Sequence, residues 1–319
     1  MAHVEPAFQS LIRVGVIGLD SSHTLQFSRR IRDMHARGQT RCRVTGCWDT
    51  EANSQTCADA AAALLELGIR STGSLDELLA SVDAAMILTQ NGHRHFDLAM
   101  NSLNRGLPTF IDKPLSCSAG DAAALVQFTR TRAVPCYSAS ALRFIDELPD
   151  FPIGSLGRLE SIEVSGPFQE TAQMPGLWYY ACHTFELLDS LWDRAGNLRR
   201  IRSRVDDTGH RINLEYHDGR SAVIGLDREG VAPFAALLRG EKGSFKFQAG
   251  SLTSYDRLVE SICRFFESGK PDIPLENTAN TIAAIECAER SLSHGGEWIT
   301  LEGHVASPTH NPGVLVRKK

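Results

Sequence analysis

The chain has 319 residues, of which 42% are hydrophobic and 22% are charged, as is usual for a folded globular protein. Its net charge of −5, from 33 basic and 38 acidic residues, argues against a nucleic-acid partner. No stretch approaches the roughly 18 uninterrupted apolar residues of a transmembrane helix, and the first ten residues lack the basic start and apolar core of a signal peptide.

The eight cysteines form no Cys-x-x-Cys pair and are sparse for a chain of this length. We therefore expect reduced thiols, most of them small core residues, in a cytoplasmic protein that makes no membrane contact. The polar segment 303–319, which contains proline and glycine, is expected to be an extended tail.

Apolar, branched strands alternate with amphipathic helices through the first part of the chain. Strands are expected at 11–17, 43–48, 84–88, 109–111 and 134–137. Helices are expected at 22–38, 53–67, 96–106 and 119–132, with a further short helix after the capping box at Ser74. This alternation predicts an α/β fold built on a Rossmann-type, doubly wound parallel sheet.

The second part of the chain has a different pattern. Hairpin turns at 207–209 and 218–219 separate strands of alternating polarity, and two helices close the chain. The expected strands are 159–164, 199–206, 210–216, 220–226, 232–238, 244–248 and 298–301, and the helices are 180–192, 253–268 and 277–293. We predict a dinucleotide-binding domain over residues 1–120, followed by an α+β domain over 121–319 with a mostly antiparallel, open sheet for substrate binding and oligomerisation.

A strand, a glycine-bearing turn and a helix form the layout of a dinucleotide site, in which the turn and the helix N-terminus bind the pyrophosphate. The turn here reads Gly18-Leu19-Asp20-Ser21-Ser22-His23, all six of which are candidate cofactor contacts. Asp20 and His23 occupy the second and third positions of the usual G-x-G-x-x-G run. A carboxylate at position 20 is unfavourable beside a pyrophosphate unless it turns away. His23 either supplies positive charge or packs at the helix end.

Asp49 follows the second strand, where an acid accepts hydrogen bonds from a ribose 2′-hydroxyl and repels a 2′-phosphate. No Arg or Lys follows it in Thr50-Glu51-Ala52, so NAD is the expected cofactor rather than NADP. The alternative is that Asp49 only caps the next helix.

Asp112-Lys113-Pro114 follows the expected strand 109–111, and the proline keeps Lys113 extended where the strand meets a loop. Ligands of open parallel sheets bind outside the carboxyl ends of the strands. Lys113 is therefore a candidate site residue, although a solvated lysine paired with Asp112 explains the same pattern.

Several segments together carry a family resemblance. Thr89-Gln90-Asn91, His95, Gly106 and Asp112-Lys113-Pro114 resemble the signature of the Gfo/Idh/MocA oxidoreductase family. Leu142-Arg143-Phe144, the turn at 154–157 and the closing helices over 255–296 also agree with it. The resemblance implies an NAD-dependent dehydrogenase that acts on a sugar, cyclitol or related polyol and forms a homodimer or homotetramer.

The second family signature, Asp-x-Gly-x-His-x-x-Asp, reads Tyr179-Tyr180-Ala181-Cys182-His183-Thr184-Phe185-Glu186 here. The resemblance implies that Lys113 stabilises the developing alkoxide and that His183 accepts the proton as hydride leaves. It also implies cofactor contacts from Thr89, Asn91, Asp112 and Lys113, and substrate contacts from Tyr179, Tyr180, Glu186, Arg143 and His95. Glu186 can instead orient His183, and Arg143 can instead hold the domain junction.

Tyr179 stands where the family has an acid, and Asp20 where it has a glycine. Two alternatives to net dehydrogenation therefore stay open: a binding or regulatory protein without hydride transfer, and an enzyme that uses tightly held NAD for elimination or glycoside cleavage. A metal site is not expected, because Cys182, His183 and Glu186 have no further ligand at a recognisable spacing.

Overall fold

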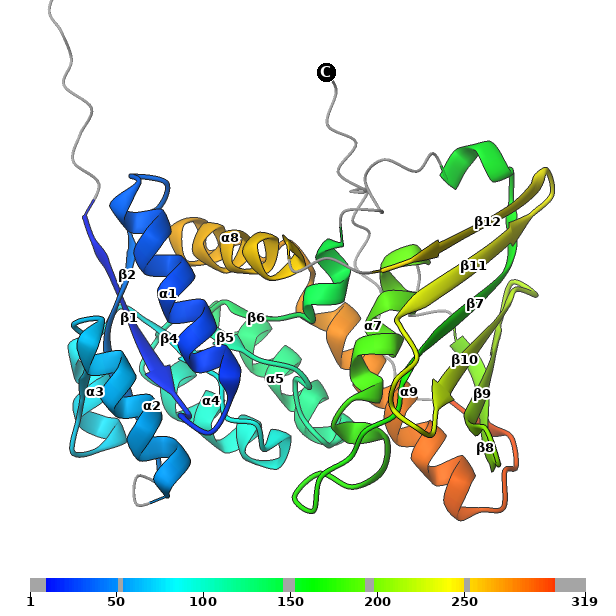
Figure 1. The fold of residues 1–319 in the computed structure, drawn as a ribbon, viewed down its shortest axis with the longest axis horizontal. Helices are drawn as coiled ribbons and strands as arrows, with labels where there is room; N and C mark the ends of the chain where they lie inside the picture. Colours follow the sequence, from blue (N-terminus) through cyan, green and yellow to red (C-terminus); the bar gives the residue numbers. More distant parts are fainter. Residues whose placement is uncertain (1–9, 51–53, 146–152, 193–197, 250–252, 302–319) are drawn as a thin grey trace, which may run out of the picture.

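The computed structural model describes residues 10–50, 54–145, 153–192, 198–249 and 253–301, and these form two sheets with their covering helices (Figure 1). The segments 1–9, 51–53, 146–152, 193–197, 250–252 and 302–319 lie outside the described residues, and the predicted tail at 303–319 lies among them.

The first sheet is parallel throughout and has the strand order β3-β2-β1-β4-β5-β6. Its strands are β1 (Ile12–Ile17), β2 (Cys42–Trp48), β3 (Arg70–Ser71), β4 (Ala84–Ile87), β5 (Thr109–Ile111) and β6 (Cys136–Ser138). The helices between them are α1 (Ser22–Ala36), α2 (Gln55–Glu66), α3 (Leu75–Ser81), α4 (His95–Leu103) and α5 (Ala119–Arg132). The predicted doubly wound sheet is confirmed.

Alternate side chains of β1 enter different cores, because successive residues of a strand point to opposite faces. Val14 and Val16 pack with α1, α2 and the later helix α8 (Thr253–Ser268), whereas Ile17 packs with the α3, α4 and α5 face. Helices therefore cover both faces of the sheet, which explains why its strands read as continuous apolar runs.

The first sheet extends past the expected domain boundary at residue 120. Helix α5 is the crossover that leads into β6, and β6 pairs with β5 through Thr109 and Cys136. Helix α8 also returns from the end of the chain to cover this sheet. The first domain therefore includes residues up to Ser138 and a helix from the last part of the sequence.

The second sheet has the order β12-β11-β7-β10-β9-β8-β13. Its strands are β7 (Leu159–Pro167), β8 (Leu198–Asp206), β9 (Gly209–Tyr216), β10 (Ser221–Asp227), β11 (Ala235–Gly240), β12 (Gly243–Gln248) and β13 (Ile299–Thr300). Every neighbouring pair is antiparallel except β7 with β10. The sheet is thus mostly antiparallel, as predicted, and β7 lies between β10 and β11, so the strand order does not follow the chain order there.

Two helices, α7 (Ala181–Leu191) and α9 (Leu275–Ser293), lie on one face of the second sheet and face the first domain (Figure 1). Short 3₁₀ turns complete the chain at η1 (Gly92–Arg94), η2 (Ala141–Phe144), η3 (Ile153–Leu156) and η4 (Gly176–Trp178). One core cluster runs without a break from Leu125 of α5 through Ile285 of α9 to Ile224 of β10. The two domains are thus joined by a shared apolar core.

The eight cysteines are unpaired, and all except Cys117 are buried. None of the helices in the described part of the chain combines the length and apolar content needed to span a membrane.

Candidate functional site

The site forms where loops from the carboxyl ends of β1, β2, β4 and β5 meet the start of α7. The turn after β1 approaches the loop after β4 closely. Gly18 has φ +99°, and a Cβ added there would lie 2.2 Å from the backbone nitrogen of Thr89. Glycine is needed at position 18 for both reasons.

Asp20, at the second glycine position, turns toward the β4 loop. Its carboxylate accepts hydrogen bonds from the Thr89 hydroxyl (3.0 Å) and from the backbone N–H of Gln90 (3.0 Å). The helix is capped instead by Ser21, whose Oγ accepts from the His23 N–H at 3.2 Å. Both carboxylate oxygens of Asp20 thus accept hydrogen bonds from the protein. The carboxylate turns away from the expected pyrophosphate position, and an acid is tolerated in this turn only in that orientation.

His23, at the third glycine position, is buried between three elements. Its Nδ1 lies 2.6 Å from Oδ2 of Asp112 at the end of β5, and its Nε2 lies 3.2 Å from the hydroxyl of Tyr255 on α8. Burial raises the pKa of Asp112, but the His23 and Lys113 charges outweigh it and lower that pKa to about 2. Asp112 is therefore ionised and paired with His23.

Asp49 is buried at the end of β2 and holds the turn after β1. Its Oδ2 accepts the backbone N–H of Leu19 at 2.5 Å. Ser54, rather than Asp49, caps α2, so the helix-cap alternative does not hold. Arg94, from η1, lies 3.8 Å from Asp49 and donates to the hydroxyl of Thr50, which places a basic group at this acid that the local sequence did not reveal.

Lys113 follows β5 and has no carboxylate partner among the described residues, since Asp112 pairs with His23. Its ammonium lies 5.3 Å from the ring centre of Tyr179 and 5.9 Å from that of Tyr180. Burial alone would lower the pKa of Lys113, but the nearby Cys182 and Asp112 raise it above its ordinary value. Lys113 is therefore a charged group held between aromatic faces.

Tyr179 links the second domain to the β4 loop. Its hydroxyl accepts a hydrogen bond from Nε2 of Gln90 at 2.8 Å. The structure thus pairs Tyr179 with Gln90 directly beside Lys113. A phenol thus stands where the family has a carboxylate.

His183 lies on the first turn of α7, with its ring centre 5.0 Å from that of Tyr180 and 5.9 Å from that of Phe234. Its Nδ1 is 2.7 Å from the hydroxyl of Ser140. Burial, and then the charge of Lys113, holds the pKa of His183 well below its ordinary value. The imidazole is therefore neutral near pH 7.

Arg143 and Glu186 form a buried ion cluster with Asp189. Arg143 Nε donates to Glu186 at 2.6 Å and Nη1 donates to Asp189, and all three side chains are at most 7% exposed. Glu186 also accepts the backbone N–H of Ser140 at 2.7 Å. The Glu186 carboxylate thus hydrogen-bonds Ser140 and Arg143, not His183, and it is shielded from solvent. The geometry therefore supports the junction role for Arg143, and it does not support substrate contacts for Arg143 or Glu186.

His95 is fully buried at the start of α4. Its Nδ1 lies 2.6 Å from the carbonyl of Pro114 and its Nε2 lies 2.9 Å from the carbonyl of Thr89. Both nitrogens thus tie the β4 loop to the β5 loop, and this geometry does not support the predicted substrate contact. Asn91 caps η1, because its Oδ1 accepts the His93 N–H, and its predicted cofactor contact stays a prediction.

Sequence reasoning missed three residues of the site: Gln90, Ser140 and Asp189. Ser140 carried a usable signal, because a serine directly before a short helical turn is a preferred cap. Gln90 and Asp189 carried none, since each acquires its role through a partner far away in the sequence.

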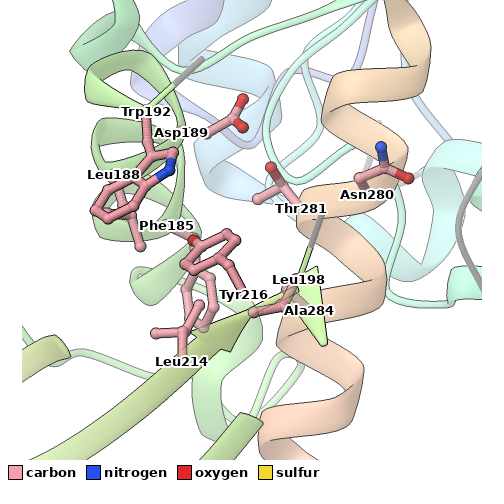
Figure 2. A pocket seen from close by; sticks show the side chains of 10 residues that line it. All are labelled: Phe185, Leu188, Asp189, Trp192, Leu198, Leu214, Tyr216, Asn280, Thr281 and Ala284. Atoms are coloured by element: carbon pink, nitrogen blue, oxygen red, sulfur yellow. The ribbon is translucent and has the colours of Figure 1, made fainter. Parts of the chain in front are cut away.

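A cavity of about 20 Å³ lies between α7, α9 and the second sheet (Figure 2). Trp192 and Tyr216 stack on one side of it, and Asp189 reaches it from α7. Its volume is far below the few hundred Å³ of an organic ligand site. The substrate is therefore not expected in this cavity. Among the described residues, no group of three or more His, Cys, Asp or Glu side chains is placed to hold a metal ion.

The residues present fit a dinucleotide. The turn after β1 keeps its first glycine and precedes a helix N-terminus, whose first N–H groups have no partner within the helix. Oδ1 of Asp112 is buried, with no hydrogen-bond partner within the described ranges, and it can accept a hydroxyl of the cofactor. The turn 18–23, Asp49 and Asp112 would hold the dinucleotide, which leaves Lys113 facing the substrate.

Comparison with known proteins agrees with this fold. Residues 12–140 match the Gfo/Idh/MocA model, described as an oxidoreductase family with an NAD-binding Rossmann fold. A search of curated proteins finds no match.

Among solved structures, a probable dehydrogenase from Thermotoga maritima has a TM-score of 0.76 at 16% identity, covering 92% of this chain and 100% of that one. The WlbA dehydrogenase from Bordetella pertussis, solved with NADH and UDP-GlcNAcA, has a TM-score of 0.72 at 17% identity, covering 91% and 99%. GenD2 from gentamicin A biosynthesis, solved with NAD, has a TM-score of 0.75 at 16% identity, covering 94% and 99%.

The class that fold and site define is thus a two-domain NAD-binding oxidoreductase. The predicted Gfo/Idh/MocA resemblance is confirmed for residues 12–140, which match the NAD-binding Rossmann model of that family. The solved structures share the fold over nearly the whole chain.

We expect Arg143→Met to lower the free energy of unfolding by about 3–5 kcal/mol, because it leaves Glu186 and Asp189 buried without their cation. Urea denaturation at pH 7 measures the change. The matched control is Arg130→Met, which breaks a pair with Glu276 in which the arginine side chain is 47% exposed, and which should cost less than about 1 kcal/mol. Equal losses in the two variants would contradict the buried-cluster account.

The neutral, buried state of His183 predicts a pH dependence of stability. Below pH 6.5 the unfolded chain binds a proton at this histidine that the folded chain does not, so stability falls as the pH decreases. Lys113, His23 and Asp112 are the charged groups that act on it. We expect His183→Gln to make the slope shallower by up to about 1.4 kcal/mol per pH unit. Urea denaturation between pH 7.5 and 5 tests this, and an unchanged slope would contradict it.

Proposed function

We propose that this protein is an NAD-dependent dehydrogenase, acting in the cytoplasm on the CH–OH group of a sugar, cyclitol or related polyol, or on the corresponding carbonyl. The observation that carries the proposal is the placement of Lys113 and His183. A charged lysine and a neutral histidine both contact the ring of Tyr180 where the two domains meet. Neither has an acidic partner among the described side chains.

In this proposal, Lys113 contacts the reacting oxygen and stabilises negative charge on it. His183 is the second hydrogen-bonding group at the same oxygen, and the hydroxyls of Tyr179 and Tyr180 face other polar groups of the substrate. NAD supplies the hydride acceptor, or NADH the donor, when it is bound. The turn 18–23 and Asp112 would hold the dinucleotide.

The sugar-like substrate class is supported by what similar proteins bind. WlbA was solved with a nucleotide sugar acid, and GenD2 belongs to the biosynthesis of gentamicin A. The aromatic rings around Lys113 add a physical reason, because aromatic faces favour the C–H faces of a sugar ring while leaving its hydroxyls for hydrogen bonds.

The test follows absorbance of NADH while a panel of polyols, and their carbonyl forms, is offered to the protein. Lys113→Met and His183→Gln should each lower turnover by roughly 10²–10⁴-fold, because each removes a group at the reacting oxygen. Lys270→Met, at an exposed lysine away from the site, should leave turnover unchanged. Unchanged turnover in both site variants would contradict the proposed roles.

We also propose a homo-oligomer, a dimer or tetramer, formed through the outer face of the second sheet. Figure 1 shows α7 and α9 on the opposite face only. Val223 of β10 and Leu237 of β11 are paired with Glu163 of β7 and lie half-buried on this face. Self-association would remove these apolar side chains from water.

Light scattering after gel filtration should report a dimer or larger species for the native chain and a shift toward monomer for Val223→Arg. Val231→Arg, at a loop valine that is 77% exposed, is the matched control and should not change the mass. A native monomer would exclude the proposed assembly.

A further inference from the structure

We infer that Ser140 fixes the tautomer of His183, so that His183 presents an N–H, not a lone pair, to the substrate oxygen. Ser140 is thus a positioning residue that acts through His183. The inference rests on the proposed function for its catalytic meaning, but its geometry stands on hydrogen bonds within the chain.

Ser140 is held in place by its own loop. It is the N-cap of η2, and its Oγ accepts the backbone N–H of Leu142 at 3.2 Å. Its backbone N–H donates to Glu186, which Arg143 holds from the other side. The hydroxyl oxygen therefore has a fixed position, 2.7 Å from Nδ1 of His183.

Counting protons decides the direction of that hydrogen bond. A serine hydroxyl has one proton and two lone pairs, and one lone pair already accepts from Leu142. If Nδ1 carried the imidazole proton, it would take the second lone pair, and the Ser140 proton would be buried with no acceptor among the described residues. Ser140 is 0% exposed, so water does not offer one either. If the hydroxyl donates to Nδ1, the Ser140 hydroxyl, the Leu142 N–H and Nδ1 of His183 all have a hydrogen-bond partner.

A neutral imidazole carries one proton, so Nε2 must carry it when Nδ1 accepts. The lowered pKa of His183, caused by burial and by Lys113, agrees with a neutral ring. Nε2 has no hydrogen-bond partner in the described part of the chain, and it is not among the fully buried polar atoms. This N–H is available to a ligand.

The consequence concerns which form of the substrate the site receives. The Lys113 ammonium and the His183 Nε2–H are both donors, so together they suit an oxygen with free lone pairs, such as a carbonyl. This inference differs from the expectation that His183 accepts the proton of a substrate hydroxyl. The site is arranged for reduction of a carbonyl rather than for removal of a hydroxyl proton by histidine.

The carbonyl oxygen accepts hydrogen bonds from Lys113 and His183, and the carbonyl carbon accepts a hydride from NADH. The electron pair of the broken C=O π bond becomes a lone pair on oxygen. The alkoxide then takes a proton from the Lys113 ammonium, and the amine recovers a proton from water, while His183 keeps its own.

The test uses the full chain with ¹⁵N-labelled histidine rings and needs neither cofactor nor substrate. Long-range ¹H–¹⁵N spectra at pH 7 report which ring nitrogen is protonated, and the spectrum of His183→Gln assigns one set among the eleven histidines. We expect a protonated Nε2 and an unprotonated, hydrogen-bonded Nδ1 at His183. A protonated Nδ1 would overturn the inference.

Ser140→Ala removes the donor and should yield a mixture of tautomers at His183, whereas Ser140→Thr keeps the hydroxyl and should keep the native one. Ser74→Ala removes a similar serine cap, on α3, and should leave the His183 signals unchanged. If Ser140→Ala leaves the tautomer unchanged, Ser140 does not set it. If Ser140→Ala does not fold, the native and Ser140→Thr spectra still decide.

These outcomes separate the inference from the proposed function. A native spectrum with protonated Nδ1 refutes the inference even if the protein oxidises a polyol. The predicted tautomer, combined with no turnover on any alcohol or carbonyl, would refute the dehydrogenase proposal and leave the Ser140 assignment in place.

Discussion

The site depends on one buried ion cluster, Arg143 with Glu186 and Asp189. Arg143 comes from the loop after the last strand of the first sheet, and the two acids come from one face of α7. The cluster therefore fixes α7, which carries His183, against the domain that carries Lys113. Buried charges of this kind contribute little net stability, but removing one partner is costly, so the arrangement is strongly determined.

The same cluster sets the orientation of His183. Glu186 holds the backbone of Ser140, and the hydroxyl of Ser140 holds the imidazole. An acid that the family pattern suggested as a partner of His183 thus acts on it through a serine. A neutral serine leaves the histidine uncharged, whereas a direct carboxylate contact would favour the imidazolium.

The sequence predicted the elements well, because alternating apolar strands and amphipathic helices are local patterns. Through the family resemblance it predicted that Lys113 and His183 act together, and in the structure both side chains approach the ring of Tyr180. It could not predict that β7 enters the second sheet between β10 and β11, because strand order depends on pairings distant in sequence. The partners of Asp20, His23 and Glu186 were unpredictable for the same reason: Gln90, Asp112 and Arg143 lie at least 43 residues away from them.

The departures from the family pattern compensate one another. Asp20 binds the backbone of Gln90, Gln90 binds the hydroxyl of Tyr179, and the ring of Tyr179 faces Lys113. Considered separately, the carboxylate of Asp20 in the turn after β1 and Tyr179 in place of an acid suggest a site that has lost its activity. Joined in one chain of contacts, they connect the turn after β1 to Lys113. Substituting any one of them alone would leave a polar group without its partner. The altered turn after β1 and Tyr179 of the second domain therefore form a single unit.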